Sequence, residues 1–127
     1  MKKFLTVAVA SIAVVLTGCA QVGAAATVGD TRISQATVQG SIDAILAERS
    51  GVDTSQMQLE TGETLNRSQL RFHLFGTLLR EVGTELRITV TKAEIDTQRA
   101  AILQQVGGAE QLPIALVAAG IAEQDLD

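Results

Sequence analysis

The strongest constraint on the fold is a stripe of apolar residues that recur at alternating spacings of three and four. The stripe consists of Phe72, Phe75, Leu79, Val82 and Leu86. Such spacings place side chains on one face of an α-helix. The sequence therefore predicts a long amphipathic helix over about 67–86, with Asn66 as its N-cap. A second row beside the stripe widens the apolar arc to about 200°, more than one packing partner covers; it is formed by Leu70, Leu74 and Leu78.

Two glycines, Gly76 and Gly83, lie seven residues apart at the edge of the stripe. A glycine costs a helix interior about 1 kcal/mol relative to alanine. A pair of glycines on one side of a helix therefore favours a close contact there. We expect the backbone of another helix to approach the long helix at these two positions.

Two elements are predicted before the long helix. Short extended segments on both sides of Gly29-Asp30 predict a small β-hairpin. Ser34 is a suitable N-cap for a helix over about 35–49 that ends before Gly51. Its apolar face is formed by Val38, Ile42, Ile45 and Leu46. Residues 50–65 are mostly polar and are predicted to form a loop.

Two further helices are predicted after the long one. Thr91 and Glu94 have the spacing of a capping box, which begins a helix over about 92–106. Its apolar face carries Ile95, Ile102 and Val106, and Gly107-Gly108 ends it. A short helix near 111–119 has Pro113 in its first turn and Gly120 after its last. Residues 122–126 resemble the first turn of a fifth helix.

The composition agrees with a helical fold. The chain has three Phe, no Trp, no Tyr and a single Pro. Abundant Ala, Gln and Leu favour helix, whereas a β-sandwich would contain more aromatic and β-branched residues. We therefore predict a mainly α fold, in which a small N-terminal β-hairpin is followed by four to five helices.

The N-terminus has the pattern of an export signal. Lys2 and Lys3 precede an apolar run from Phe4 to Leu16. A basic head followed by a short apolar segment is typical of a secretory signal peptide. The run has 13 residues, fewer than the roughly 20 that a helix needs to cross a bilayer. The segment is therefore predicted to direct export rather than to remain as a membrane span.

A lipidation motif follows this apolar run. Leu16, Thr17, Gly18 and Cys19 resemble the lipobox of bacterial prolipoproteins, in which the cysteine receives diacylglycerol before cleavage. The resemblance implies a signal peptide at 1–18 and lipid on Cys19. The alternative is an ordinary signal peptide with an incidental or core cysteine, but Cys19 is the only cysteine in the chain. Because two acyl chains anchor a protein stably, we expect an extracytoplasmic lipoprotein on the cell membrane or the outer membrane.

The mature chain is small and acidic. Removal of residues 1–18 leaves 109 of the 127 residues, which suffices for one domain. We expect a tether at 19–26 and a domain at 27–127. The chain carries 10 Lys and Arg against 14 Asp and Glu, and two of the lysines leave with the signal, so the mature net charge is about −6. This balance argues against nucleic acid as a partner and leaves the lipid as the attachment to the membrane.

No catalytic centre is predicted. His73 is the only histidine, and a lipidated Cys19 offers no thiol, so a nucleophile and its base cannot be assembled. We expect His73 on the polar surface of the long helix. Glu60 and Glu63 lack the further ligands that a metal needs. The protein is therefore expected to be neither an enzyme nor a metal or cofactor protein.

The order of these elements resembles the N-terminal chaperone domain of the SurA and PrsA family of extracytoplasmic folding factors. The resemblance covers about 24–127. It is carried by Val28-Gly29-Asp30, Ile33-Ser34, Ile88 to Thr91, Glu94-Ile95, Gly107-Gly108, Ala118 to Ile121 and Asp125-Leu126. It implies a foldase-type chaperone that binds unfolded or newly exported polypeptides. The candidate peptide-binding residues are those of the stripe: Phe72, Phe75, Leu79, Val82 and Leu86. The alternative is that all five are core residues.

Two departures from the family pattern limit what the resemblance implies. Arg87 stands where the family usually has a glycine that turns the chain after the long helix, which puts a left-handed cap there in doubt. The chain also has no room for the parvulin-type prolyl isomerase domain that often follows. We therefore predict no isomerase activity for these residues, and such activity would belong to a longer parent chain.

Other functions remain open from the sequence alone. An envelope lipoprotein that docks one fixed protein partner fits the same features, as does the N-terminal fragment of a longer prolyl isomerase. The sequence stops about one turn into a helix, which is too short to be stable alone. We therefore expect a fold that is incomplete at its C-terminus, with apolar surface exposed along the long helix. Dimerisation that covers the stripe is the alternative.

Overall fold

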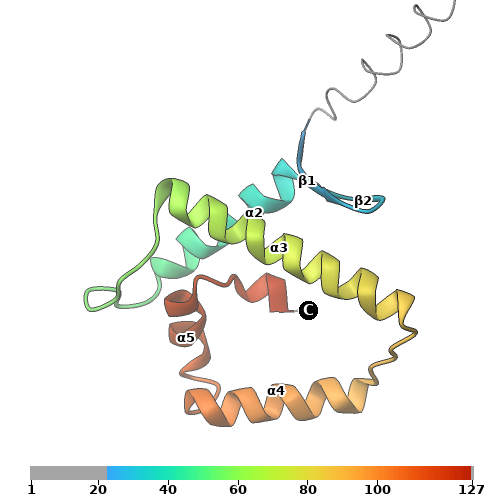
Figure 1. Ribbon diagram of the computed structural model, residues 1–127. Coiled ribbons are helices and arrows are strands. Elements are labelled where there is room, and N and C mark those ends of the chain that lie inside the picture. Colours follow the sequence, from blue (N-terminus) through green and yellow to red (C-terminus); the bar gives the residue numbers. More distant parts are fainter. Residues whose placement is uncertain (1–22, 127) are drawn as a thin grey trace, which may run out of the picture.

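The computed structural model describes residues 23–126 and is mainly helical (Figure 1). Its elements follow in the order β1 (Ala24–Val28), β2 (Thr31–Ser34), α2 (Gln35–Arg49), α3 (Gly62–Glu85), α4 (Lys92–Val106), α5 (Leu112–Ala119) and the 3₁₀ turn η2 (Glu123–Leu126). The predicted fold class is confirmed, because a two-stranded antiparallel hairpin is followed by four α-helices. The signal, the lipobox and Cys19 lie outside the described residues.

The hairpin forms where the sequence predicts it. β1 pairs antiparallel with β2, with Val28 opposite Thr31. Between them Gly29 adopts a φ of +54°, which a glycine tolerates best. β1 already begins at Ala24, so residues 24–26, which were assigned to the tether, belong to the hairpin instead.

The core lies where the hairpin, α2 and α3 meet. Ser34 caps α2 by accepting a hydrogen bond from the Thr37 N–H at 3.0 Å. The buried residues of this core are Ile33, Val38, Ile42, Ile45, Leu65 and Ala122. Three of the four predicted apolar residues of α2 are thus buried. The fourth, Leu46, is half exposed, since the elements packed on α2 do not cover it.

Helix α3 begins five residues earlier than predicted, and Asn66 is not its N-cap. Thr61 precedes the helix and makes no side-chain cap hydrogen bond, so the sequence contains no clear signal for this start. The helix extends to Gly62 because Leu65 is buried in the core, at 2% exposure. The first turn also forms an exposed ion pair between Glu63 and Arg67 at 3.1 Å.

The left-handed cap after α3 is present in spite of the arginine. Arg87 has a φ of +55°. The Ile88 N–H donates to the Gly83 carbonyl at 2.8 Å, and the Arg87 N–H donates to the Thr84 carbonyl at 3.1 Å. These two bonds form a Schellman motif, which usually has a glycine at the left-handed position.

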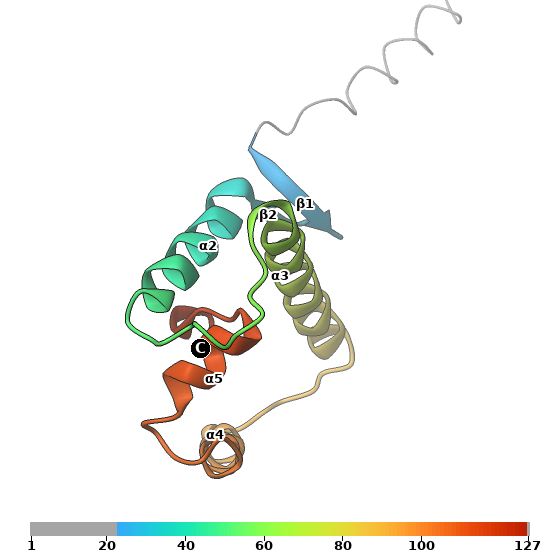
Figure 2. The same ribbon diagram turned by 90° about the vertical axis from the view of Figure 1, so that its left-hand side faces the viewer.

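The C-terminal half forms an arm that leaves α3 and returns to α2. The capping box at Thr91 and Glu94 is confirmed, and α4 ends at Gly107 as predicted. Helix α4 packs against α5, while α5 and η2 pack against α2. Figures 1 and 2 show α3 and α4 as opposite sides of an open frame, with α5 at one end.

Candidate polypeptide-binding surface

The interior side of α3 carries polar residues that are satisfied by hydrogen bonds. Gln69 is 3% exposed and donates from Nε2 to the Gly120 carbonyl at 2.7 Å. His73 Nε2 lies 2.8 Å from the hydroxyl of Ser41, which is buried on α2. The expectation of a surface histidine was therefore wrong: His73 is half-buried because α2 packs against this side of α3.

The apolar stripe of α3 lies on the outward side. Its five members, Phe72, Phe75, Leu79, Val82 and Leu86, are between 38% and 65% exposed. The interpretation of all five as core residues is therefore wrong. Leu65, Leu70 and Leu74 supply the apolar contact of α3 with the core instead. The structure thus leaves the larger side chains of the long helix in contact with water.

The glycines beside the stripe have no neighbour. A Cβ atom built on Gly76 or Gly83 would meet nothing within 4 Å among the described residues. The expectation that a helix backbone approaches them is not met in this part of the chain. Both positions therefore belong to the same uncovered side of α3.

A cavity of about 580 Å³ lies where the first part of the stripe meets the end of α5. Phe72 and Phe75 line it from α3, and residues 118–121 line it from α5 and the turn after it. The first part of the stripe is therefore turned toward the end of α5. Its apolar lining is accessible from outside, since Phe75 is 61% exposed.

Two arginines border the same cavity. Arg49, the last residue of α2, donates from Nη1 to the Glu60 carbonyl at 2.9 Å, while its buried Nε has no hydrogen-bond partner among residues 23–126. Arg71 is exposed and forms no ion pair within residues 23–126. Glu60 lines the cavity as well, so this end of the stripe carries two positive charges and one negative charge next to two aromatic rings.

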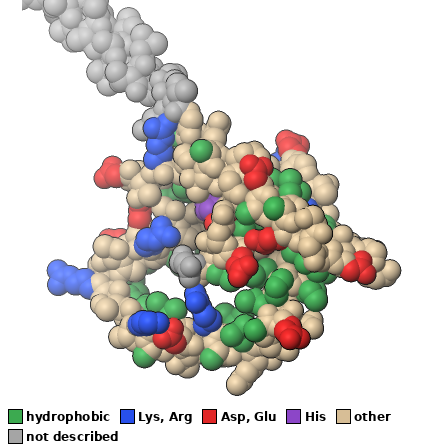
Figure 3. All heavy atoms as spheres, turned by 180° about the vertical axis from the view of Figure 1, so that it is seen from behind, with side chains coloured by type: hydrophobic (Ala, Val, Ile, Leu, Met, Phe, Trp, Pro, Cys, Tyr) green, Lys and Arg blue, Asp and Glu red, His purple; other side chains and the backbone are tan. Residues whose placement is uncertain are grey.

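The arm presents a second apolar groove that the sequence did not single out. It has a volume of about 450 Å³ and is lined by Val90, Ile95, Ile102, Leu103, Leu112, Leu116 and Leu126, with Glu94, Gln98, Arg99 and Glu123 among them. None of the α4 residues is buried. Ile95 and Ile102, seven residues apart, were identified as one apolar face but not as a binding surface. Figure 3 shows hydrophobic side chains gathered around a hollow in this half of the molecule.

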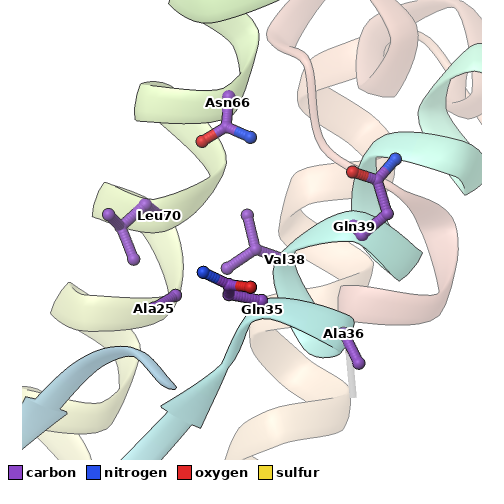
Figure 4. A pocket seen from close by; sticks show the side chains of 7 residues that line it. All are labelled: Ala25, Gln35, Ala36, Val38, Gln39, Asn66 and Leu70. Atoms are coloured by element: carbon purple, nitrogen blue, oxygen red, sulfur yellow. The ribbon is translucent and has the colours of Figure 1, made fainter. Parts of the chain in front are cut away.

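A third cavity, of about 530 Å³, lies between β1, α2 and α3 (Figure 4). Its lining combines apolar side chains with the amides of Gln35, Gln39 and Asn66. Gln39 already donates to Asp43 at 2.8 Å. The cavity offers hydrogen-bonding amides but no nucleophile or charged group, and no residue of the stripe lines it.

Charged groups within residues 23–126 do not assemble into a metal site, because no three His, Cys, Asp or Glu side chains lie close enough together. Two exposed carboxyls have altered acidity. Hydrogen bonds from the Thr91 backbone N–H and then its hydroxyl lower the pKa of Glu94. The Ser55 backbone N–H and then its side chain lower the pKa of Asp53 in the same way. Both effects stabilise local turns, and neither group borders the stripe.

No helix within the described range is both long enough and apolar enough to span a bilayer. The predicted attachment through Cys19 lies outside that range. Comparison of the chain with protein-family models, with curated proteins and with solved structures found no match.

Proposed function

We propose that this protein is a membrane-tethered extracytoplasmic chaperone that holds unfolded or newly exported polypeptides on the apolar side of α3. The observation that carries the proposal is the exposure of five large apolar side chains along one side of α3, whose buried residues, Leu65, Gln69 and Thr77, lie outside the stripe. Contiguous exposed apolar surface of this kind marks binding sites in soluble proteins. An unfolded polypeptide exposes the apolar groups that such a surface removes from water.

The shape of the surface favours binding without strict sequence preference. All five side chains of the stripe are at least 38% exposed, and the cavity beside Phe72 and Phe75 is a partly open cleft. Binding energy from apolar contact is non-directional and grows with the area buried. Many different apolar segments could therefore use the same surface, as the clients of a chaperone require.

The resemblance to the SurA and PrsA family supports the same function. The chain has a hairpin, a helix, a long helix and a capped helix in the order that the resemblance implies. A lipid on Cys19 would hold the domain beside the membrane, where exported chains emerge unfolded. The resemblance and the anchor are both expectations from the sequence, whereas the exposed stripe is an observation.

The proposal is tested by the suppression of client aggregation. The lipidated protein in vesicles is mixed with a denatured, aggregation-prone client, and light scattering is followed. Leu79→Ser, in the stripe, is compared with Leu46→Ser, on α2. These two leucines have similar exposure, 55% and 50%, so the control matches the change in residue type and in surface polarity.

We expect the wild type and Leu46→Ser to suppress aggregation and Leu79→Ser to do so several-fold less well. Equal suppression by all three would exclude the stripe as the client site, and no suppression by the wild type at several-fold excess would exclude the chaperone function. The alternative function, docking of one fixed partner, predicts a single stoichiometric protein in a pull-down from native membranes. A chaperone predicts many weakly bound ones.

A further inference from the structure

The stripe of α3 has the repeat of a coiled-coil seam. Its alternating spacings of three and four assign Phe72, Leu79 and Leu86 to the a positions of a heptad and Phe75 and Val82 to the d positions. A helix with a and d apolar packs best against a second helix, whose side chains fill the holes between its own. The shape of the uncovered side of α3 therefore fits a helical occupant.

The positions beside the seam also fit a close helix. With Phe72 at a, Gly76 and Gly83 both occupy e positions, and nothing lies within 4 Å of a Cβ built on either. Residues without side chains on one flank let a second helix backbone approach the seam. The two glycines have no packing role within the described chain. Against a second helix, they would allow its backbone to pack closely on α3.

The other flank is complementary to itself. Its g positions are Arg71, Leu78 and Glu85, so that a positive charge, an apolar centre and a negative charge follow at intervals of seven residues. All three are exposed, and neither charged group forms an ion pair within residues 23–126. In an antiparallel pair of helices, each g position lies beside a g position of the other helix. Two copies of α3 would therefore place unlike charges together at both ends.

We propose that the uncovered side of α3 is occupied by a second copy of this chain, through an antiparallel α3–α3 pair with its two-fold axis near Leu78. Arg71 then lies beside Glu85 of the partner subunit, and Glu85 lies beside Arg71 of the partner subunit. Near the two-fold axis, Leu78 packs against Leu78 of the partner subunit. On the opposite flank, Gly76 lies beside Gly76 of the partner subunit. Such an interface uses the same patch on both subunits, so association stops at the dimer.

The later part of the stripe is accessible to a second helix, since Leu79 and Leu86 are 55% and 65% exposed. Helix α4 packs against α5, and Figures 1 and 2 show it set apart from α3. Burial of the stripe would remove from water the large apolar side chains that the monomer leaves exposed.

This inference does not rest on the proposed function, although it concerns the same surface. A client and a second copy would compete for the stripe, so the dimer would be the resting form and clients would bind as it opens. A failure of the dimer would leave client binding untouched, because cross-linking between copies and suppression of aggregation are separate measurements.

The test is cysteine cross-linking of the full chain in native membranes. Cys19 is the only cysteine, so an introduced thiol is the reactive group if Cys19 carries lipid, and the wild type serves as the control. With a short bismaleimide, Leu78→Cys should give a covalent product of twice the monomer mass. Membranes that contain both Arg71→Cys and Glu85→Cys chains should give the product, and each variant alone should give several-fold less.

Charge reversal tests the pairing in the same assay. In the Leu78→Cys background, Arg71→Glu places like charges together at both ends and should reduce the product several-fold, as should Glu85→Arg. The combined Arg71→Glu/Glu85→Arg chain restores unlike pairs and should recover the yield. Arg80→Glu, on the same helix but at a b position away from the seam, is the matched control and should leave the yield unchanged.

Three outcomes would overturn the proposal. The first is a monomer that gives no product with any of the introduced cysteines. The second is a product from identical Arg71→Cys chains that is as abundant as that from the Arg71→Cys and Glu85→Cys mixture, which would indicate parallel helices. The third is cross-linking of Leu78→Cys to other proteins only, which would identify the occupant as a client.

Discussion

The hydroxyl of Ser41 and Nε2 of His73 lie 2.8 Å apart, and the hydrogen bond between them joins α2 to α3 in the interior. Ser41 is 1% exposed. A buried polar group costs free energy unless it is paired. Because this pair is satisfied, α3 can turn His73 inward beside Leu70 and Leu74 and leave its apolar stripe outside. The orientation that creates the candidate site thus depends on a polar contact on the opposite side of the helix.

Removal of the Ser41 hydroxyl should destabilise the domain. Ser41→Ala leaves a ring nitrogen of the half-buried His73 without a partner, at a cost of about 1–3 kcal/mol in the free energy of unfolding. Urea unfolding followed by circular dichroism measures it. Ser68→Ala is the matched control, since Ser68 is a half-buried helical serine without a hydrogen bond in the described structure; it should stay within about 0.5 kcal/mol of the wild type. A double-mutant cycle with His73→Ala should give a coupling energy of at least about 0.5 kcal/mol, and additive single effects would contradict the pairing.

The stripe should contribute little to stability although its residues are large and apolar. In the monomer, at a protein concentration too low for α3–α3 pairing, Leu79→Ala should change the free energy of unfolding by about 0.5 kcal/mol or less, as surface substitutions do. Ile45→Ala, at a fully buried position of α2, should cost about 2–5 kcal/mol. Dye binding also distinguishes the two variants. Leu79→Ala removes exposed apolar surface and should therefore lower the fluorescence of a bound hydrophobic dye. A cost of several kcal/mol for Leu79→Ala would place the stripe in the core.

The sequence predicts those elements that carry strong end signals. Ser34 and the capping box at Thr91 locate the starts of α2 and α4, and the glycines after α4 and α5 locate their ends. The start of α3 lacks such a signal, because Thr61 makes no cap hydrogen bond and the first turn is held by Leu65 instead. Burial of one residue by tertiary packing is not visible in local sequence, and the predicted boundary was therefore five residues late.

The orientation of α3 was harder to predict than its existence. Periodicity identifies two apolar rows, one with Phe72 and Phe75 and one with Leu70 and Leu74, but it does not say which row faces the core. The choice depends on pairs that are distant in the sequence, such as Gln69 with the carbonyl of Gly120. Periodicity alone was enough to identify the stripe as a candidate site. It was not enough to place His73, whose position depends on its contact with Ser41.

The left-handed arginine gives a stabilising substitution. A left-handed conformation costs an L-residue other than glycine about 1–2 kcal/mol, so a glycine at this position avoids that cost. The greater conformational entropy of glycine in the unfolded chain offsets part of the resulting stabilisation. Arg87→Gly should therefore raise the free energy of unfolding by about 0.5–1 kcal/mol. Arg80→Gly, an exposed position inside the same helix, should lower it by about 1 kcal/mol. In thermal unfolding, Arg87→Gly should therefore raise the melting temperature and Arg80→Gly should lower it. A lower melting temperature for both variants would argue against the left-handed cap.

Acid should weaken the start of α4. Hydrogen bonds from Thr91 favour the charged form of Glu94, so its pKa is lower in the folded protein than in the unfolded chain. The resulting stabilisation is complete above the ordinary pKa of a glutamate and is lost as the pH falls through the lowered folded-state pKa. The protection factors of the amides at 92–95, which correct for the intrinsic pH dependence of exchange, should therefore fall in acid. Glu94→Gln keeps an acceptor for the cap and should flatten this dependence, whereas Glu110→Gln, outside the helices, should not.

The predicted lipid anchor can be tested by replacing Cys19 with serine. Cys19→Ser replaces the sulfur that would carry diacylglycerol with an oxygen that is a much weaker nucleophile. The variant should lose its lipid and accumulate as uncleaved precursor or as a soluble exported form, because the apolar run from Phe4 to Leu16 is too short for a stable membrane span. Fractionation and mass spectrometry of the N-terminus measure both effects, with Thr17→Ser as a control that preserves the cysteine. If Cys19→Ser is processed like the wild type and stays with the membranes, the protein is held there by something other than lipid on this residue.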